Sequence, residues 1–263
     1  NKVISKKYNK LIFYGVDTYA DIYFNGEKII EANNMFHSWE YDVSKLIRLG
    51  ENTIEVQFRS PLNEVVTIME KLDYKLPADN DQAGGTSPYT RKAPYHYGWD
   101  WGPCLVTSGL WKKVELISFN STYVENVSFN QSRCDTSMAK LALEVEFFSD
   151  SKQKYHICVE EETKNIREEF EISAIEGINN FFEIIKIIKP ELWWPSGHGK
   201  QYLYNFKIKI HSIDFNDVYE KRIGIRDVLI KRDKDKDGES FAISVNGKPI
   251  YSKGANWIPA DSF

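Results

Sequence analysis

The stretch that decides the fold class is LALEVEFF, residues 141–148. Its apolar side chains fall on one side and its charged side chains on the other, with Leu141, Leu143, Val145 and Phe147 opposite Glu144 and Glu146. Successive side chains of a β-strand point to opposite faces, so this period of two predicts a sheet with one buried face and one solvated face. The chain is therefore expected to be all-β.

The same period recurs outward from this stretch. It predicts further strands over residues 53–59, 111–118, 155–160, 181–189, 202–211 and 218–223. Residues 22–29 and 241–251 each carry a central Asn-Gly pair and are expected to form hairpins, since Asn-Gly suits the two positive φ values of a type I′ turn. In the first half of the chain helical spacing occurs once, in a segment that starts at Pro61 and continues through Leu62, Val65, Val66, Met69 and Leu72.

Composition narrows the class of function. Aromatic residues make up 14% of the 263 residues, which suits both β structure and contact with carbohydrate. A net charge of −4 argues against nucleic acid, and no apolar run is long enough to span a membrane. The cysteines Cys104, Cys134 and Cys158 are expected to be buried free thiols, and the histidines show no ligand spacing. Neither a metal nor a cofactor is predicted.

The segment YGWDWGP, residues 97–103, places a carboxylate between two indoles and brackets them with turn residues. Burying an unpaired carboxylate is costly, and neighbouring indoles rarely face solvent without a reason. A sugar site would use both groups, because an indole stacks on the apolar face of a pyranose while Asp100 accepts hydrogen bonds from hydroxyls. The alternative is a core loop in which Asp100 caps backbone N–H groups. The long polar loop 78–90 leads to this segment and fits a functional loop or a disordered one.

Two changes in pattern indicate domain boundaries. Before residues 119–123 the strands carry the aromatic-rich segments, and after them come about seven plainer strands, as an immunoglobulin-like sandwich requires. The pattern changes again near Gly224. The predicted domains are 1–119, 120–223 and 224–263.

An ordered set of motifs resembles the β-mannosidases of glycoside hydrolase family 2. Residues 15–26, 34–36, 41–43 and 50–53 are similar to the family's sugar-binding jelly-roll, and 91–94 with 98–103 to an element of its mannosidase branch. Residues 193–195 and 224–226 are similar to the passage from sandwich to barrel, and 254–261 to the first barrel strand. The resemblance implies a jelly-roll, an immunoglobulin-like sandwich and the first strands of a (β/α)₈ barrel.

The resemblance also implies an activity. A family 2 β-mannosidase is an exo-acting, retaining enzyme that removes terminal β-linked mannose, using two glutamates about 5–5.5 Å apart. Both would lie beyond Phe263, on a barrel continuing the same polypeptide. This chain is therefore expected to be an inactive fragment. A stand-alone carbohydrate-binding protein and the sister β-galactosidases and β-glucuronidases stay open as alternatives.

Carried onto this sequence, the resemblance assigns four residues to the mannose subsite. Asp100 would accept hydrogen bonds from outer hydroxyls of the sugar, and Trp99 would wall the pocket. Asn256 and Trp257 lie where a barrel strand would open toward the active site, although Trp257 fits a core position equally well. Trp101 is expected to serve packing.

Three other signals are weaker. Residues 233–238 imitate the start of a calcium loop, but Ser244 stands where the bidentate Glu belongs, so a charged hairpin tip is expected. The acidic runs 160–162 and 168–169 are expected to be solvated, because no apolar shell surrounds them. The sequons at Asn120, Asn126 and Asn130 would matter only in a secretory pathway.

Overall fold

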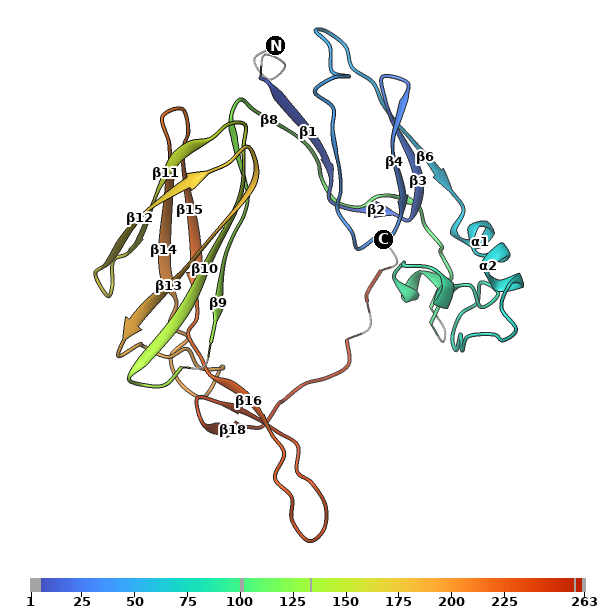
Figure 1. Ribbon diagram of the computed structural model, residues 1–263. Coiled ribbons are helices and arrows are strands. Elements are labelled where there is room, and N and C mark those ends of the chain that lie inside the picture. Colours follow the sequence, from blue (N-terminus) through green and yellow to red (C-terminus); the bar gives the residue numbers. More distant parts are fainter. Residues whose placement is uncertain (1–5, 100–101, 133, 258, 262–263) are drawn as a thin grey trace. The chain divides into compact units, whose positions relative to one another are not determined.

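The computed structural model describes residues 6–99, 102–132, 134–257 and 259–261 (Figure 1). Strands dominate it, so the all-β prediction is confirmed. The chain divides into two compact units. One contains residues up to 120 together with those from 256 onward, and the other contains residues 121–255.

The first unit is a jelly-roll sandwich of antiparallel strands. One sheet has the order β5 (Trp39–Asp42), β1 (Tyr8–Phe13), β8 (Val114–Phe119). A second has the order β4 (Glu27–Asn33), β3 (Tyr19–Phe24), β6 (Ile54–Arg59), and β2 (Val16–Asp17) pairs with β7 (Gly109–Leu110). One apolar cluster joins β1, β2, β3 and β4, which makes this pair of sheets a sandwich.

The first predicted hairpin is confirmed as β3 and β4. Asn25 and Gly26 have φ values of 51° and 88°, which are the two positive values of a type I′ turn. The Asn25 side chain strengthens this turn, since its Oδ1 accepts a hydrogen bond from the Thr53 N–H at 2.9 Å. The turn thereby also ties the start of β6 to the hairpin.

The predicted helix is two short helices rather than one. These are α1 (Pro61–Glu64) and α2 (Val66–Glu70), and they meet at Val65. Val65 is fully buried, whereas Val66 and Ile68 are exposed. Short helices gain most of their stability from packing an apolar face, and here Pro61 and Val65 are the buried residues of that face. The prediction of one continuous helix is therefore wrong.

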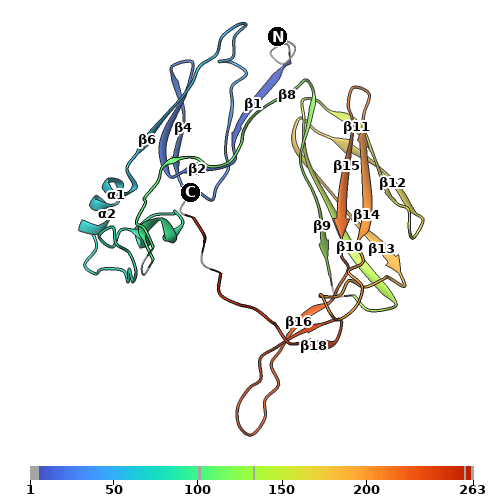
Figure 2. The ribbon, with the colours of Figure 1, turned by 180° about the vertical axis from the view of Figure 1, so that it is seen from behind.

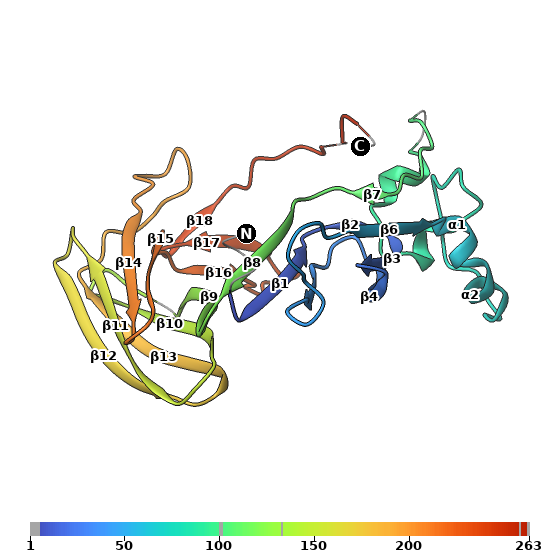
Figure 3. The same ribbon diagram turned by 90° about the horizontal axis from the view of Figure 1, so that it is seen from above.

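The second unit is an immunoglobulin-like sandwich, whose strands can be followed in Figures 2 and 3. Its three-stranded sheet has the order β13 (Gly177–Ile188), β10 (Met138–Ser149), β9 (Thr122–Gln131). The four-stranded sheet has the order β12 (Ile166–Ala174), β11 (Gln153–Glu161), β14 (Tyr204–His211), β15 (Asn216–Ile223). The apolar side of LALEVEFF lies in the core between them, and Glu144 and Glu146 are exposed, as predicted.

A small antiparallel sheet follows, in the order β16 (Val228–Lys231), β17 (Ala242–Val245), β18 (Lys248–Ile250). Asn246 and Gly247 turn the second predicted hairpin with positive φ, and residues 233–238 lie at the tip between β16 and β17. The described residues after 250 form no strand. The described residues of the segment similar to a first barrel strand are thus irregular, and a parallel barrel strand is held by neighbouring barrel strands.

Two smaller predictions need correction. Glu161 was expected in a solvated acidic run but is only 2% exposed, because it faces inward at the end of β11 and binds the following turn. All three cysteines are free, yet only Cys158 is buried, whereas Cys104 and Cys134 are half-buried. Among the described residues, no helix has the length and apolar character to cross a membrane.

Candidate functional site

The segment predicted to bind sugar is bracketed by two glycines that its backbone requires. Gly98 has a φ of 98°, a backbone angle that residues other than glycine rarely adopt. The Gly102 N–H donates to the Trp99 carbonyl oxygen at 2.5 Å, and a Cβ on Gly102 would lie 2.9 Å from that oxygen. Trp99 is 44% exposed on this tight turn. Asp100 and Trp101 lie outside the described residues.

Gln82 supports both sides of this turn. Its N–H donates to the Tyr97 carbonyl at 2.8 Å, and its Nε2 donates to the Gly102 carbonyl at 3.3 Å. The Gln82 side chain also packs on Gly98, where a Cβ would lie 2.8 Å from Gln82 Cδ. The long polar loop therefore holds the Trp99 turn through direct hydrogen bonds from Gln82. No sequence pattern indicated this role for Gln82.

A buried ion pair involves the chain before and after this segment. Lys92 has no exposed side-chain surface and Asp17, on β2, has 5%. The Lys92 ammonium donates to Asp17 Oδ2, to the Thr107 carbonyl at 2.8 Å and to Thr107 Oγ1 at 3.3 Å. Thr107 Oγ1 is also 3.2 Å from Asp17 Oδ2, and the Thr18 hydroxyl donates to Asp17 Oδ1. Burial lowers the pKa of Lys92, and Asp17 opposes that shift.

The stretches of chain before and after the segment make further hydrogen bonds to the sandwich. Before it, the Met35 N–H donates to the Arg91 carbonyl at 3.0 Å, and the Ala93 N–H donates to Met35 Sδ at 3.0 Å. After it, the chain enters β7, where Gly109 pairs with Asp17. The buried ion pair is thus one part of a wider attachment of this segment to β2 and to the end of β4.

A cavity of about 430 Å³ adjoins the ion pair. Its lining residues are Asp17, Met35, Tyr95, His96, Thr107, Ser108, Gly109, Leu110 and Trp111. Trp111 is fixed within this wall, because its Nε1 donates to the Met35 carbonyl at 2.9 Å and its indole lies where a Cβ on Gly15 would clash. Trp111 is therefore held as part of the cavity wall that adjoins the ion pair.

The other two predicted site residues lie elsewhere in the chain. Asn256 and Trp257 are both exposed, Trp257 to 86%, and neither belongs to a strand. No hydrogen bond between described residues joins either of them to Trp99. Trp257 does not occupy a core position in this structure.

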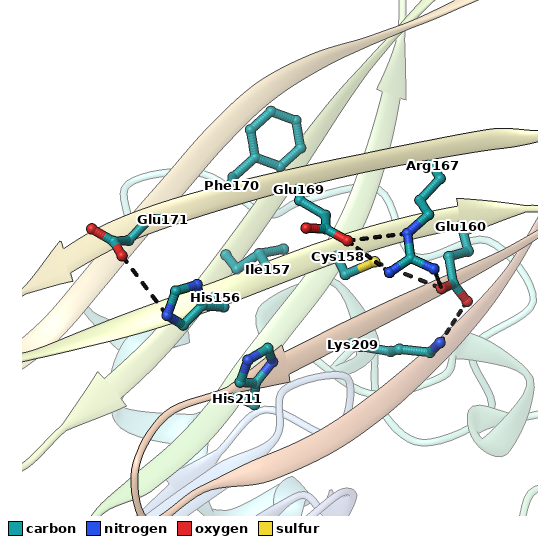
Figure 4. Close-up of a pocket in the computed structure, with 10 residues that line it drawn as sticks. All are labelled: His156, Ile157, Cys158, Glu160, Arg167, Glu169, Phe170, Glu171, Lys209 and His211. Carbon is teal, nitrogen blue, oxygen red and sulfur yellow. Dashed lines mark hydrogen bonds and ion pairs between the residues drawn. The ribbon is translucent and has the colours of Figure 1, made fainter.

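A second hollow, of about 420 Å³, lies on the outer face of the four-stranded sheet (Figure 4). Its charged side chains pair with one another: Lys209 Nζ lies 2.6 Å from Glu160 Oε2, and Arg167 Nη2 lies 2.7 Å from Glu169 Oε1. Lys209 lowers the pKa of Glu160, chiefly by its hydrogen bond. Arg167 and Glu169 are mostly exposed, so this is a surface ion-pair network. The described residues contain no cluster of three or more His, Cys, Asp or Glu side chains suited to a metal ion.

Comparison with known families assigns both units. Residues 1–112 match the glycosyl hydrolase 2 galactose-binding domain-like family, and residues 122–226 match the glycosyl hydrolases family 2. The chain carries two domains of glycoside hydrolase family 2. Its relatives in this family include β-mannosidase B of Emericella nidulans, with 33% identity, and the β-mannosidase of Mus musculus, with 31% identity. These alignments cover 96% and 97% of this chain but only 30% of either relative.

Solved structures agree with this assignment. A β-D-mannosidase from Dictyoglomus thermophilum matches all of this chain with a TM-score of 0.89 and 33% identity, and the match covers 32% of that enzyme. An exo-chitosanase from Amycolatopsis orientalis matches 96% of the chain with a TM-score of 0.68 at 19% identity, which supports the fold alone. The chain thus spans about a third of the length of the enzymes it matches.

Proposed function

We propose that this chain is the non-catalytic N-terminal part of a retaining exo-β-mannosidase that hydrolyses terminal, non-reducing β-D-mannose residues. The observation that carries the proposal is the 33% identity to a β-mannosidase over 96% of this chain. Its domains are proposed to be a jelly-roll at 1–119, an immunoglobulin-like sandwich at 120–223 and the beginning of a barrel at 224–263.

The Trp99 turn is proposed to complete the mannose subsite. Half-exposed indoles offer a flat apolar face on which a pyranose can stack, and Trp99 is such an indole on a well-held turn. Asp100 is proposed to accept hydrogen bonds from the outer hydroxyls of the sugar. Asn256 and Trp257 are proposed to join the subsite from the barrel side.

The bond-breaking chemistry is assigned to the barrel, outside residues 1–263. In a retaining glycosidase one carboxylate attacks the anomeric carbon, and a second protonates the leaving oxygen and later activates water. The residues of this chain would hold the sugar in position for that attack. The chain by itself is therefore expected to be inactive.

The test uses the complete gene product. Hydrolysis of aryl β-mannoside, β-galactoside and β-glucuronide is compared for the wild type, Asp100→Ala and the matched control Asp79→Ala, which removes an exposed carboxylate. A charge-assisted hydrogen bond contributes about 1.5–3 kcal/mol, so Asp100→Ala should lower kcat/KM for the mannoside at least about tenfold. Asp79→Ala should leave it unchanged.

Other outcomes separate the alternatives. A preference for the galactoside or glucuronide would assign the chain to a sister enzyme. Sugar binding without hydrolysis of any substrate would favour a carbohydrate-binding protein. A normal kcat/KM in Asp100→Ala would return Asp100 to a structural role.

A further inference from the structure

We propose that Asp17, Lys92 and Thr107 form a clasp that sets the position of the Trp99 turn. Lys92 lies on the chain segment that enters the turn, Thr107 lies on the segment that leaves it, and Asp17 belongs to β2 of the sandwich. The clasp thus joins both segments to the scaffold at one point. As an account of sugar positioning, the inference rests on the proposed function of this loop.

The hydrogen bonds of the clasp are complete. The Lys92 ammonium has three donor hydrogens, and three acceptors surround it: Asp17 Oδ2, the Thr107 carbonyl and Thr107 Oγ1. Both oxygens of Asp17 are also bound, because the Thr18 hydroxyl reaches Oδ1. A fully buried ammonium is tolerated only when it is paired in this way.

Stability alone does not account for an ion pair at this position. Apolar side chains of similar volume often stabilise a protein as well as a buried ion pair does, or better. An apolar side chain, however, cannot bind the backbone carbonyl of Thr107. Lys92 makes that bond while pairing with Asp17, and so it fixes the distance between the two segments that flank the turn.

The effect of the clasp should be measurable at the turn itself. Two amides report on it: Gly102 N–H, which donates to the Trp99 carbonyl, and Gln82 N–H, which donates to the Tyr97 carbonyl. The first hydrogen bond closes the turn itself, and the second ties the polar loop to the segment that enters the turn. Their hydrogen exchange therefore measures how firmly the turn is held, with no sugar present.

The experiment compares two variants of this chain by hydrogen exchange and thermal unfolding. Lys92→Met leaves the Asp17 carboxylate unpaired, so both Tm and protection at Gln82 and Gly102 should fall. The double variant Asp17→Asn/Lys92→Met has no unpaired charge and should recover much of the lost Tm. Exchange at Gln82 and Gly102 should nevertheless stay about tenfold or more faster than in the wild type, because Met cannot bind the Thr107 carbonyl. Recovery of wild-type exchange in the double variant would overturn the proposal.

Two further variants keep the test decisive. Thr107→Val replaces the hydroxyl with a methyl group and so removes the two clasp hydrogen bonds that the hydroxyl makes, to Lys92 and to Asp17. It leaves the ion pair in place and serves if the charge variants fail to fold. It should speed exchange at Gln82 and Gly102 about threefold or more, and an unchanged rate in folded Thr107→Val would contradict the clasp. Arg59→Met breaks another ion pair of the same unit, to Asp21. It should lower Tm without selectively speeding exchange at these two amides, whereas equal acceleration there would also overturn the proposal.

The experiments test the clasp and the proposed sugar subsite separately. Unchanged exchange in the clasp variants, together with a damaging Asp100→Ala, would remove the clasp and keep the subsite. Faster exchange with an indifferent Asp100→Ala would keep the clasp as an anchor of the turn and remove the proposed function. In the complete gene product, positioning by the clasp predicts a lower kcat/KM for the mannoside in Thr107→Val.

Discussion

Among the described residues, each unit of the molecule buries one carboxylate almost completely, and the two are held in different ways. Glu161, at the end of β11 in the immunoglobulin-like unit, accepts hydrogen bonds from the Thr163 hydroxyl and the Lys164 N–H, two and three residues further on. Asp17, in the jelly-roll, is held by Lys92 and Thr107, which lie 75 and 90 residues away in sequence.

The difference separates two uses of a buried charge. The partners of Glu161 belong to the turn between β11 and β12, so its carboxylate stabilises a local feature that a hairpin needs. Apart from the adjacent Thr18 hydroxyl, the partners of Asp17 come from distant segments, and these segments flank the turn that carries Trp99. Burying an ion pair is costly, and in the jelly-roll that cost is incurred beside the proposed sugar subsite.

The largest expected effect comes from removing one partner of the Asp17 pair. Lys92→Met leaves a buried carboxylate without a compensating charge and should lower the free energy of unfolding by about 3–5 kcal/mol. Urea denaturation of the jelly-roll unit measures this loss. A loss below about 1 kcal/mol would mean that water reaches Asp17 and that the pair is not effectively buried.

An intermediate effect is expected at Glu161. Glu161→Ala removes the acceptor of the Thr163 hydroxyl and the Lys164 N–H, which should cost about 1–3 kcal/mol. The change should stay local, so exchange of the Lys164 amide should accelerate while the Gln82 and Gly102 amides keep their wild-type rates. Faster exchange at Gln82 would contradict the view that this carboxylate acts locally.

The same contrast explains how much of the structure the sequence could predict. Strands such as β10 were predictable because alternation is a local signal, and both Asn-Gly hairpins because their turn chemistry lies in two adjacent residues. β12 was missed, because Glu168 interrupts the apolar side of its alternation, between Ile166 and Phe170. It lies at a sheet edge, where charged side chains discourage pairing with other chains.

The clasp could not be predicted for a related reason. Asp17 and Lys92 both fall within motifs of the family resemblance, but nothing in one sequence pairs residues so far apart. Gln82 was equally hidden in a polar loop that had no periodicity. The Trp99 turn itself was visible, because two indoles around a carboxylate form a local anomaly. Local anomalies thus indicated where the site lies, whereas the contacts that hold it needed the fold.

The smallest expected effect comes from Asp21. Its partner Arg59 is distant in sequence, but the carboxylate is not fully buried. Lys28 lies 2.6 Å from its Oδ1, and Arg59 binds its other oxygen. These partners, with the Lys28 hydrogen bond first, hold the pKa of Asp21 below its ordinary value. The unfolded chain therefore binds more protons than the folded chain as the pH falls toward that value. The stabilisation by Asp21 is present above the ordinary pKa and is lost as the pH falls through the folded pKa.

Asp21→Asn should accordingly cost under about 1 kcal/mol at neutral pH, because solvent screens its partly exposed partners. The difference from the wild type should shrink in acid, where the native carboxyl is protonated as well. Parallel urea titrations at neutral and acidic pH measure both effects. Asp21 and Asp17 each have a basic partner that is distant in sequence, Arg59 and Lys92, and they differ in burial. If Asp21→Asn cost as much as Lys92→Met, burial would not be what distinguishes the clasp, and the case for a special role at the Trp99 turn would weaken accordingly.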